Sequence, residues 1–393
     1  MNFKMEHPTF QAFVEEVRQW RRYLHMHPEP SFEEHNTMNY VSQILTKYGI
    51  EHQKNIAKTG IVARIAAKHH PLDMPCLALR ADLDALPIEE QNDVPYKSQV
   101  PGWMHACGHD VHTSILLGTA VMLHASAEQL KRPIKLIFQP GEEQNPGGAS
   151  LMIKAGVLEN PPVEQLVALH VYPELPVGQL GIKSGLYMAS SDEIHVEIEG
   201  VGGHGALVDR FINPIDIGMS WMQQSKQQIL ALCPDEVPQV LTFGRFEALG
   251  STNVVASSAS IKGTFRTMNE TWRAKAKTIL AQTAQQVAAS YGAKIHLNFN
   301  EGYPFLNNDT VLTEKVKGIL SQEFGADNIH ELDLRMTAED FAFYGQHRPI
   351  CLFRLGTGNA QKGIVHAVHH PKFDIDEQAL QIGIRAMLSI AMQ

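Results

Sequence analysis

Three short apolar runs in the first half of the chain end abruptly in acidic or histidine residues. CLALR runs into Asp82 and Asp84, IKLIFQPG runs into Glu142 and Glu143, and QLVAL runs into His170. Such runs are typical of buried strands, and the segments between them, such as TSILLGTAVMLHASAEQL, carry apolar residues at helical spacing. This alternation predicts a doubly wound α/β sheet, in which sites form beyond the carboxyl ends of the strands. We therefore expect the side chains that follow the three runs to converge.

The pattern changes near Tyr187. Residues 187–302 follow the order strand, helix, strand, strand, helix, strand, which predicts a smaller α+β domain of ferredoxin-like type. Its second helix is expected to begin at an Asn269 cap and to end at Gly292. Since 393 residues exceed what one hydrophobic core usually supports, we expect two domains: residues 1–186 with 303–393, and the insertion 187–302.

The stretch HACGHDVH places Cys107 and His109 two residues apart, with Gly108 between them. In an extended segment both side chains can reach one ion, so the pair is a candidate metal site. Two other interpretations stay open. Cys107 is then either a buried structural cysteine beside ordinary histidines or a thiol nucleophile with a histidine base, although a nucleophile would leave the neighbouring carboxylates unused.

Glu142 and Glu143 are adjacent, so their side chains point in different directions, and this suits a division of labour. One carboxylate can bind a metal while the other takes a proton from water. Two solvated glutamates on a loop are the simple alternative.

Histidines at two other places are also candidate ligands. His170, taken alone, fits a core histidine satisfied by the backbone. Near the C-terminus, VHAVHHPKFD offers His366, His369 and His370, and spacing cannot choose among them.

In the predicted insertion, GVGGHGA lacks the lysine and serine or threonine of a phosphate loop, so its glycines more plausibly let His204 project toward a ligand. Asn253 and Arg266 fit ordinary strand residues as well as substrate contacts. An arginine on an apolar strand is nevertheless suited to a bidentate grip on a substrate carboxylate.

Composition limits the partners and the compartment. The formal charge of -9, without a basic patch, argues against a nucleic-acid or anionic-membrane binder. Four scattered cysteines suggest a reducing, cytoplasmic setting rather than a disulfide scaffold. We see no signal peptide and no run approaching the roughly 20 apolar residues of a membrane span.

Several motifs together resemble one known family, namely LRADLDALPIEE, MHACGHDVHTSILLGTA, FQPGEEQNPGGASLMIKAGVLE, ALHVYPELPVG, GVGGHGA, GTFRTMN, EDFAFY and VHHPKFD. In this order they resemble the amidohydrolase branch, subfamily D, of peptidase family M20. That branch includes aminoacylases, hippurate hydrolases, auxin-conjugate hydrolases and N-acetyl-diaminopimelate deacetylases. The resemblance covers the chain from about Arg22 to its C-terminus.

The resemblance implies a site with two divalent metal ions (Mn, Zn, Co or Ni). By motif position its ligands are Cys107, His109, Glu143, His170 and His369, with the Cys107 thiolate as a bridge. His369 is preferred because the family pattern is His-x-Pro. Glu142 is implied as the general base that activates a bridging water, His204 as a group that reaches the substrate carbonyl, and Asn253 and Arg266 as substrate contacts.

The implied function is a metal-dependent amidohydrolase that cleaves N-acyl amino acids to a carboxylate and a free amino acid. The small-molecule alternatives are a metallo-carboxypeptidase or dipeptidase and an N-acetyl-diaminopimelate deacetylase. A non-catalytic metal-binding protein or a cysteine-nucleophile enzyme is the alternative of a different class. The insertion itself suggests a hinge, by which the smaller domain closes as a lid over the metals, and the exposed strand edge of this domain predicts a homodimer.

Overall fold

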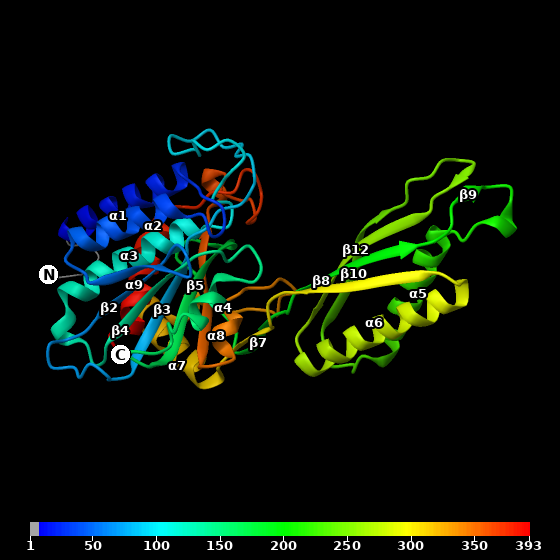
Figure 1. The fold of residues 1–393 in the computed structure, drawn as a ribbon. Helices are drawn as coiled ribbons and strands as arrows, with labels where there is room; N and C mark the ends of the chain where they lie inside the picture. Colours follow the sequence, from blue (N-terminus) through cyan, green and yellow to red (C-terminus); the bar gives the residue numbers. More distant parts are fainter. Residues whose placement is uncertain (1–7) are drawn as a thin grey trace. The chain divides into compact units, whose positions relative to one another are not determined.

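The computed structural model describes residues 8–393 of the chain, which form two compact units (Figure 1). Unit 1 comprises the chain up to Gly185 together with Asn307–Asp333 and Asp340–Gln393. Unit 2 comprises Leu186–Leu306 and Leu334–Glu339. In sequence, unit 2 is thus inserted into unit 1, and each unit has its own hydrophobic core.

Unit 1 is built on an eight-stranded sheet in the order β1-β2-β4-β3-β5-β16-β6-β15. The strands are β1 (His52–Ile56), β2 (Gly60–Ile65), β3 (Cys76–Asp82), β4 (Ile134–Gln139), β5 (Val163–Pro176), β6 (Leu180–Ile182), β15 (Ile329–Glu331) and β16 (Ile350–Gly358). The central strands β4, β3, β5 and β16 are parallel, whereas β1, β2 and β6 pair with their neighbours β2, β4 and β16 in antiparallel fashion. Every residue of β3, β4 and β16 is buried, as expected for strands covered on both faces.

The helices of unit 1 pack around this sheet (Figure 1). They are α1 (Pro8–Met26), α2 (His35–Lys47), α3 (His109–Ala125), α4 (Gly148–Lys154), α7 (Thr310–Phe324), α8 (Ala342–Gly345) and α9 (Gln378–Ala391). Helix α3 is buried on all sides from His109 to Leu123 and contacts α1, α9 and β3. Its first residue therefore lies inside the protein, at the edge of the sheet where the parallel strands end.

Unit 2 has a four-stranded antiparallel sheet in the order β10-β12-β8-β13, packed against two helices. Its elements are β8 (Asp192–Glu199), β9 (Gly203–His204), α5 (Pro214–Leu232), β10 (Gln239–Glu247), β11 (Val254–Val255), β12 (Ser258–Thr267), α6 (Glu270–Tyr291) and β13 (Lys294–Glu301). Strands β9 and β11 pair separately, as do β7 (Gly185–Met188) and β14 (Leu306–Asn308). The predicted fold class, a doubly wound α/β sheet with an α+β insertion, is confirmed, with the addition of the antiparallel strands in the large sheet.

Local sequence explains the elements of unit 2. The alternation in β8 buries Ile194, Val196 and Ile198 and leaves the glutamates at 193, 197 and 199 exposed, as on a sheet with one wet face. Helix α6 begins where the Asn269 side chain accepts a hydrogen bond from the backbone N–H of Trp272 at 2.8 Å. It ends at Gly292, which adopts a left-handed conformation with φ 62°.

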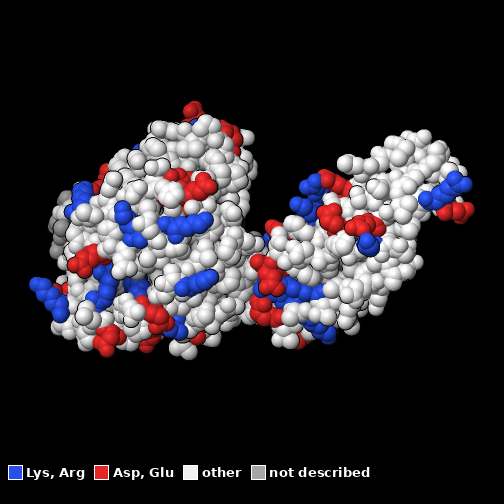
Figure 2. Space-filling model, viewed as in Figure 1, with Lys and Arg blue, Asp and Glu red and all other residues white. Residues whose placement is uncertain are grey.

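Two surface properties bear on the choice of partner. Among the described helices, none is long and apolar enough to cross a membrane. On the face that Figure 2 shows, lysine and arginine side chains are interspersed with aspartate and glutamate in each unit.

Candidate metal centre

The side chains that follow the three predicted strands do converge at one edge of the sheet in unit 1. Strand β3 ends at Asp82, β4 ends just before Glu142 and Glu143, and β5 carries His170. Strand β3 runs parallel to both β4 and β5, so the carboxyl ends of β3 and β4 lie level with His170, although β5 continues beyond His170 to Pro176. Helix α3 begins at the same edge with His109.

Gly108 makes the approach of this helix to β5 possible. It lies immediately before α3 with φ 82°, a left-handed conformation that suits glycine. A Cβ atom there would lie 2.6 Å from Cγ2 of Val171, the residue after His170. The absence of a side chain therefore lets Cys107 and His109 come close to His170.

Cys107 is at the middle of the resulting cluster. Its Sγ atom lies 3.4 Å from Nε2 of His170 and 3.4 Å from Nε2 of His369. The Glu143 carboxylate lies 3.3 Å from His369 Nε2 and 3.9 Å from His109 Nε2. The structure thus brings together five side chains from four separate segments of unit 1.

The hydrogen bonds of two histidines leave their Nε2 atoms available as ligands. His109 Nδ1 donates to Asp84 Oδ1 at 3.1 Å, and His170 Nδ1 donates to the carbonyl oxygen of Val171 at 2.8 Å. In a neutral imidazole, a donating Nδ1 leaves a lone pair on Nε2. His109 Nε2 is buried and has no hydrogen-bond partner among the described residues. A divalent ion is the kind of partner that such an atom needs.

Two aspartates at the end of β3 hold the surrounding groups. Asp84 accepts hydrogen bonds from His109, from the Glu143 backbone N–H at 2.9 Å and from Ser31 Oγ at 2.6 Å. Burial raises the pKa of Asp84, but its hydrogen bond with His109 and the other donors outweigh burial, so the pKa is lowered and the carboxylate stays ionised.

The second aspartate acts through His112. Asp82 Oδ1 accepts from His112 Nδ1 at 2.6 Å, and His112 Nε2 accepts from the backbone N–H of Val171 at 2.9 Å. This chain of hydrogen bonds links the end of β3 to the strand that carries His170. The sequence marked Asp82 and Asp84 as strand-end residues but did not show which histidine each would contact.

The two adjacent glutamates have different surroundings. Glu142 is 7% exposed, and its Oε1 lies 3.4 Å from the backbone nitrogen of Asp340. Glu143 instead faces His109 and His369. Glu143 forms a group of possible ligands with Cys107 and His369, and Glu142 forms one with His109 and Glu143.

The three C-terminal histidines have different surroundings. His369 is the one that contacts Cys107 and Glu143, and its φ of 65° is rare for a residue other than glycine. His366 and His370 stack on each other with ring centroids 4.2 Å apart, and His370 Nδ1 accepts a hydrogen bond from the Lys372 backbone.

The chemistry of Cys107 differs from that of an activated nucleophile. Burial, together with the nearby Glu143 charge, raises the pKa of the thiol. Hydrogen bonds with Cys107 and Glu143 raise the pKa of His369 to about 10. Without a metal, the thiol is therefore mainly protonated at neutral pH, and a lowered pKa, the usual mark of a nucleophilic cysteine, is not found.

The remaining predicted site residues belong to unit 2. His204 is exposed in β9, and it pairs with Val254 of β11, next to Asn253. The Gly205 backbone N–H donates to the carbonyl oxygen of Asn253 at 2.8 Å. Arg266 lies on β12, half-buried, and the described part of the chain offers it no ion pair.

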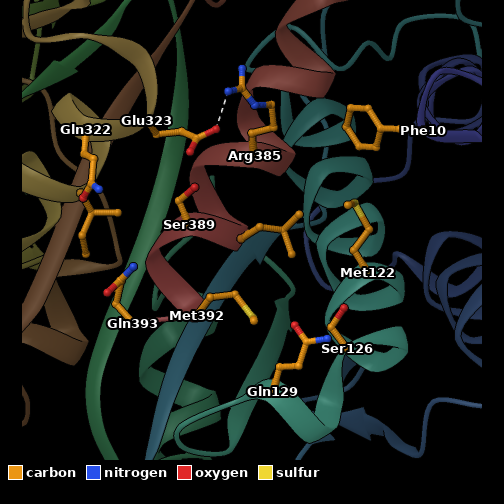
Figure 3. A pocket seen from close by; sticks show the side chains of 12 residues that line it. Phe10, Met122, Ser126, Gln129, Gln322, Glu323, Arg385, Ser389, Met392 and Gln393 are labelled. Atoms are coloured by element: carbon orange, nitrogen blue, oxygen red, sulfur yellow. Dashed lines mark hydrogen bonds and ion pairs between the residues drawn. The ribbon is translucent and has the colours of Figure 1, made fainter. Parts of the chain in front are cut away.

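The cavity in Figure 3 is a different feature of unit 1. It has a volume of about 460 Å³ and lies between the ends of α3, α7 and α9, where Arg385 pairs with Glu323. None of the candidate ligands lines it, and its polar side chains include glutamines and serines with no metal-binding cluster. The geometry therefore favours the strand-end cluster as the functional site.

Comparison with known proteins identifies the family of the chain. A model of peptidase family M20/M25/M40 matches residues 78–393. The chain belongs to peptidase family M20. The resemblance predicted from the motifs is confirmed, and as a member of this family the protein is a metal-dependent hydrolase that acts on amide bonds.

Three relatives of this M20 hydrolase illustrate the range of the family. The chain is 36% identical over 368 residues to the N-acetyl-L-cysteine deacetylase of Bacillus subtilis, covering 92% of this chain and 83% of the relative. It is 35% identical over 388 residues to thermostable carboxypeptidase 2 of Saccharolobus solfataricus, covering 97% and 96%. The solved structure of the Bacillus subtilis YXEP protein, a dinuclear metal binding peptidase from the M20 family, has a TM-score of 0.82 and 32% identity, covering 97% and 98% of the two chains.

The burial of Cys107 leads to a prediction for the metal-free protein. At neutral pH, iodoacetamide should modify the half-buried Cys233 before Cys107, because the pKa of both thiols is raised and Cys107 is the less accessible of the two. Peptide mass mapping after timed alkylation measures the order. Faster modification of Cys107 than of Cys233 would favour the cysteine-nucleophile alternative.

Proposed function

We propose that this M20 enzyme hydrolyses N-acyl amino acids and uses two divalent ions. The main support for this proposal is the convergence of a thiol, three imidazoles and two carboxylates at one edge of the unit 1 sheet. We assign five of these side chains as metal ligands: Cys107, His109, Glu143, His170 and His369. Catalysis is thereby assigned to unit 1, and the roles of lid and dimerisation domain are assigned to unit 2.

Two ions are favoured because Cys107 belongs to two ligand groups at once. One group is Cys107, His109 and His170, and the other is Cys107, Glu143 and His369; in each, the ligand atoms lie within 4.8 Å of one another. A thiolate shared by both groups can bridge two ions. The mixture of sulfur, nitrogen and oxygen donors suits Zn, Mn, Co or Ni.

The proton transfers are assigned to Glu142. Divalent ions bound here would act as Lewis acids that favour ionisation of water and polarise a carbonyl oxygen. Glu142 is buried, and its carboxylate lies within 4.8 Å of ligand atoms of His109 and Glu143. It takes a proton from the attacking water and later delivers that proton to the leaving amine nitrogen, so that the products are a carboxylic acid and a free amine.

His204 is proposed to donate a hydrogen bond to the substrate carbonyl oxygen. The Ala206 backbone N–H lies 3.2 Å from His204 Nδ1 and donates to it. The proton of the neutral ring is then on Nε2, which is free to donate to an oxygen that gains negative charge.

Arg266 and Asn253 are proposed as substrate contacts. Burial lowers the pKa of Arg266, and no described carboxylate compensates for the lost hydration. A half-buried guanidinium without a partner is suited to a carboxylate ligand, which an N-acyl amino acid supplies. A dipeptide and N-acetyl-diaminopimelate supply one as well, so a panel of these substrates beside N-acetyl and N-benzoyl amino acids tests the substrate class.

Glu142→Gln should lower kcat for N-acetyl amino acids by roughly 10²- to 10⁴-fold, because the amide cannot accept the proton. Metal content, measured by inductively coupled plasma mass spectrometry, should stay at the wild-type level. Glu164→Gln, an exposed position on β5, is the control and should retain full activity.

Chelation provides the matching test on the wild-type enzyme. A chelator should abolish turnover, and added Mn, Zn, Co or Ni should restore it. Wild-type turnover by Glu142→Gln would show that another group is the base, and turnover that survives complete metal removal would contradict the whole mechanism.

Arg266→Ala should raise KM for N-acyl amino acids about tenfold to a hundredfold, the effect of losing a hydrogen-bonded charge pair, and should change kcat less. Lys262→Ala, an exposed position on the same strand, is the control. The corresponding N-acyl amino acid amides, which lack the carboxylate, should not distinguish Arg266→Ala from the wild type. Equal losses for acid and amide substrates would assign Arg266 to the structure of unit 2 instead.

We also propose a homodimer through unit 2. Most of the large apolar side chains that are exposed in residues 8–393 belong to this unit, among them Val208, Met219, Leu230, Leu232, Leu249 and Val254. Exposed apolar surface of this kind is typical of an interface.

Replacement of an apolar side chain of unit 2 by a charge tests the dimer. Sedimentation velocity should show a dimer for the wild type and a monomer for Leu230→Glu with Leu249→Glu. The control Val311→Glu, at an equally exposed position of α7, should leave the dimer intact. A monomeric wild type at all concentrations would contradict the proposal.

A further inference from the structure

A buried polar network joins α1 to the first turn of α3. Arg21 on α1 is fully buried, and its Nε donates to Asp110 Oδ2 at 2.8 Å. His25, one helical turn further along α1, has Nδ1 2.9 Å from the same oxygen and Nε2 3.3 Å from Glu90 Oε1. All four side chains are at most 3% exposed. Among the described residues, no hydrogen bond or ion pair joins these four side chains to a proposed metal ligand.

The network reaches α3 directly beside the two proposed ligands Cys107 and His109. Asp110 is the second residue of α3, directly after His109, and Gly108 provides no side chain to cap the helix. The direction of this first helical turn determines where the Cys107 and His109 side chains point. Asp110 is the only acidic residue in that turn. Its carboxylate is buried and forms an ion pair with Arg21 of α1.

Two further carboxylates hold the Arg21 side chain in position. Its Nη2 donates to Asp374 Oδ1 at 3.3 Å, and Nη1 lies 3.6 Å from Glu377 Oε1. Buried ion pairs seldom make a protein more stable than well-packed apolar residues do, because burial removes the hydration of both charges. The buried ion pairs of Arg21 are therefore better explained by their effect on the position of α3 than by a gain in stability.

We propose that Arg21 is a positioning residue of the metal centre, which acts through Asp110 to hold the Cys107–His109 segment in the geometry that binds metal. The proposal rests on the proposed function, because it assumes that Cys107 and His109 are ligands. A simple role in packing α1 against α3 would stabilise the fold without changing metal affinity, so the two roles can be separated by experiment.

The test compares two adjacent arginines of α1. Arg21→Met removes the buried partner of Asp110. Arg22→Met is the control, since Arg22 binds Glu377 with two hydrogen bonds of 2.9 and 2.6 Å and, among the described residues, has no hydrogen bond or ion pair with α3. For each metal-free variant, the Co²⁺ affinity is measured by competition with a chromophoric chelator, and the thiolate-to-cobalt absorption band reports whether Cys107 is bound. Thermal unfolding of the metal-free protein reports stability.

Arg21→Met should weaken Co²⁺ binding about tenfold to a hundredfold, the usual effect of losing a group that orients ligands, and should reduce the thiolate band. Arg22→Met should keep the wild-type affinity and band. Arg21→Lys, which can still donate one hydrogen bond to Asp110, should recover part of the affinity. A folded Arg21→Met protein with wild-type affinity and band would overturn the proposal.

Removal of one member of a buried pair can prevent folding, so a second variant is included. Arg21→Met combined with Asp110→Leu removes both charges of the Arg21–Asp110 pair together, so neither of the two is left buried alone. This double variant should fold and still bind Co²⁺ more weakly than the wild type, and unchanged binding by it would also overturn the proposal. If wild-type protein showed no thiolate band, the proposed function would fail instead, independently of Arg21.

Discussion

The ionised carboxylate of Asp84, buried at the end of β3, is the interaction on which the site depends. A buried charge needs several donors, and Asp84 finds them on three segments: the His109 ring, the Glu143 backbone and the Ser31 hydroxyl. These hydrogen bonds hold together the start of α3, the loop after β4 and the loop after α1. Asp82 adds a fourth connection, through His112 to β5.

The first turn of α3 is held by buried charges on two sides. On one side Asp84 orients His109, and on the other Arg21 holds Asp110. Between these points Gly108 allows the backbone to approach Val171. Such a supporting set of contacts is what a metal centre with several ligands requires, because small displacements of the donor atoms weaken binding.

Much of the architecture could be predicted from residue patterns. The alternation in β8 and the Asn269 and Gly292 boundaries of α6 depend on local backbone preferences, which neighbouring residues express directly. The convergence of His170, on β5, with the residues after β3 and β4 followed from the rule for parallel strands. Arg21 was not recognised, although it occupies the buried stripe of α1 in register with Val14 and Val17. A charged residue at an apolar position of an amphipathic helix was the available signal.

The sequence by itself determined the two-unit α/β and α+β organisation and the kinds of side chain at the strand ends, because periodicity and chain order depend on near neighbours. Only the tertiary structure decided that His369, rather than His366 or His370, faces Cys107, and that Asp84 orients His109. Those choices depend on the distances between segments far apart in the sequence. The packing that sets them, including the space left by Gly108, exists only when the chain is folded.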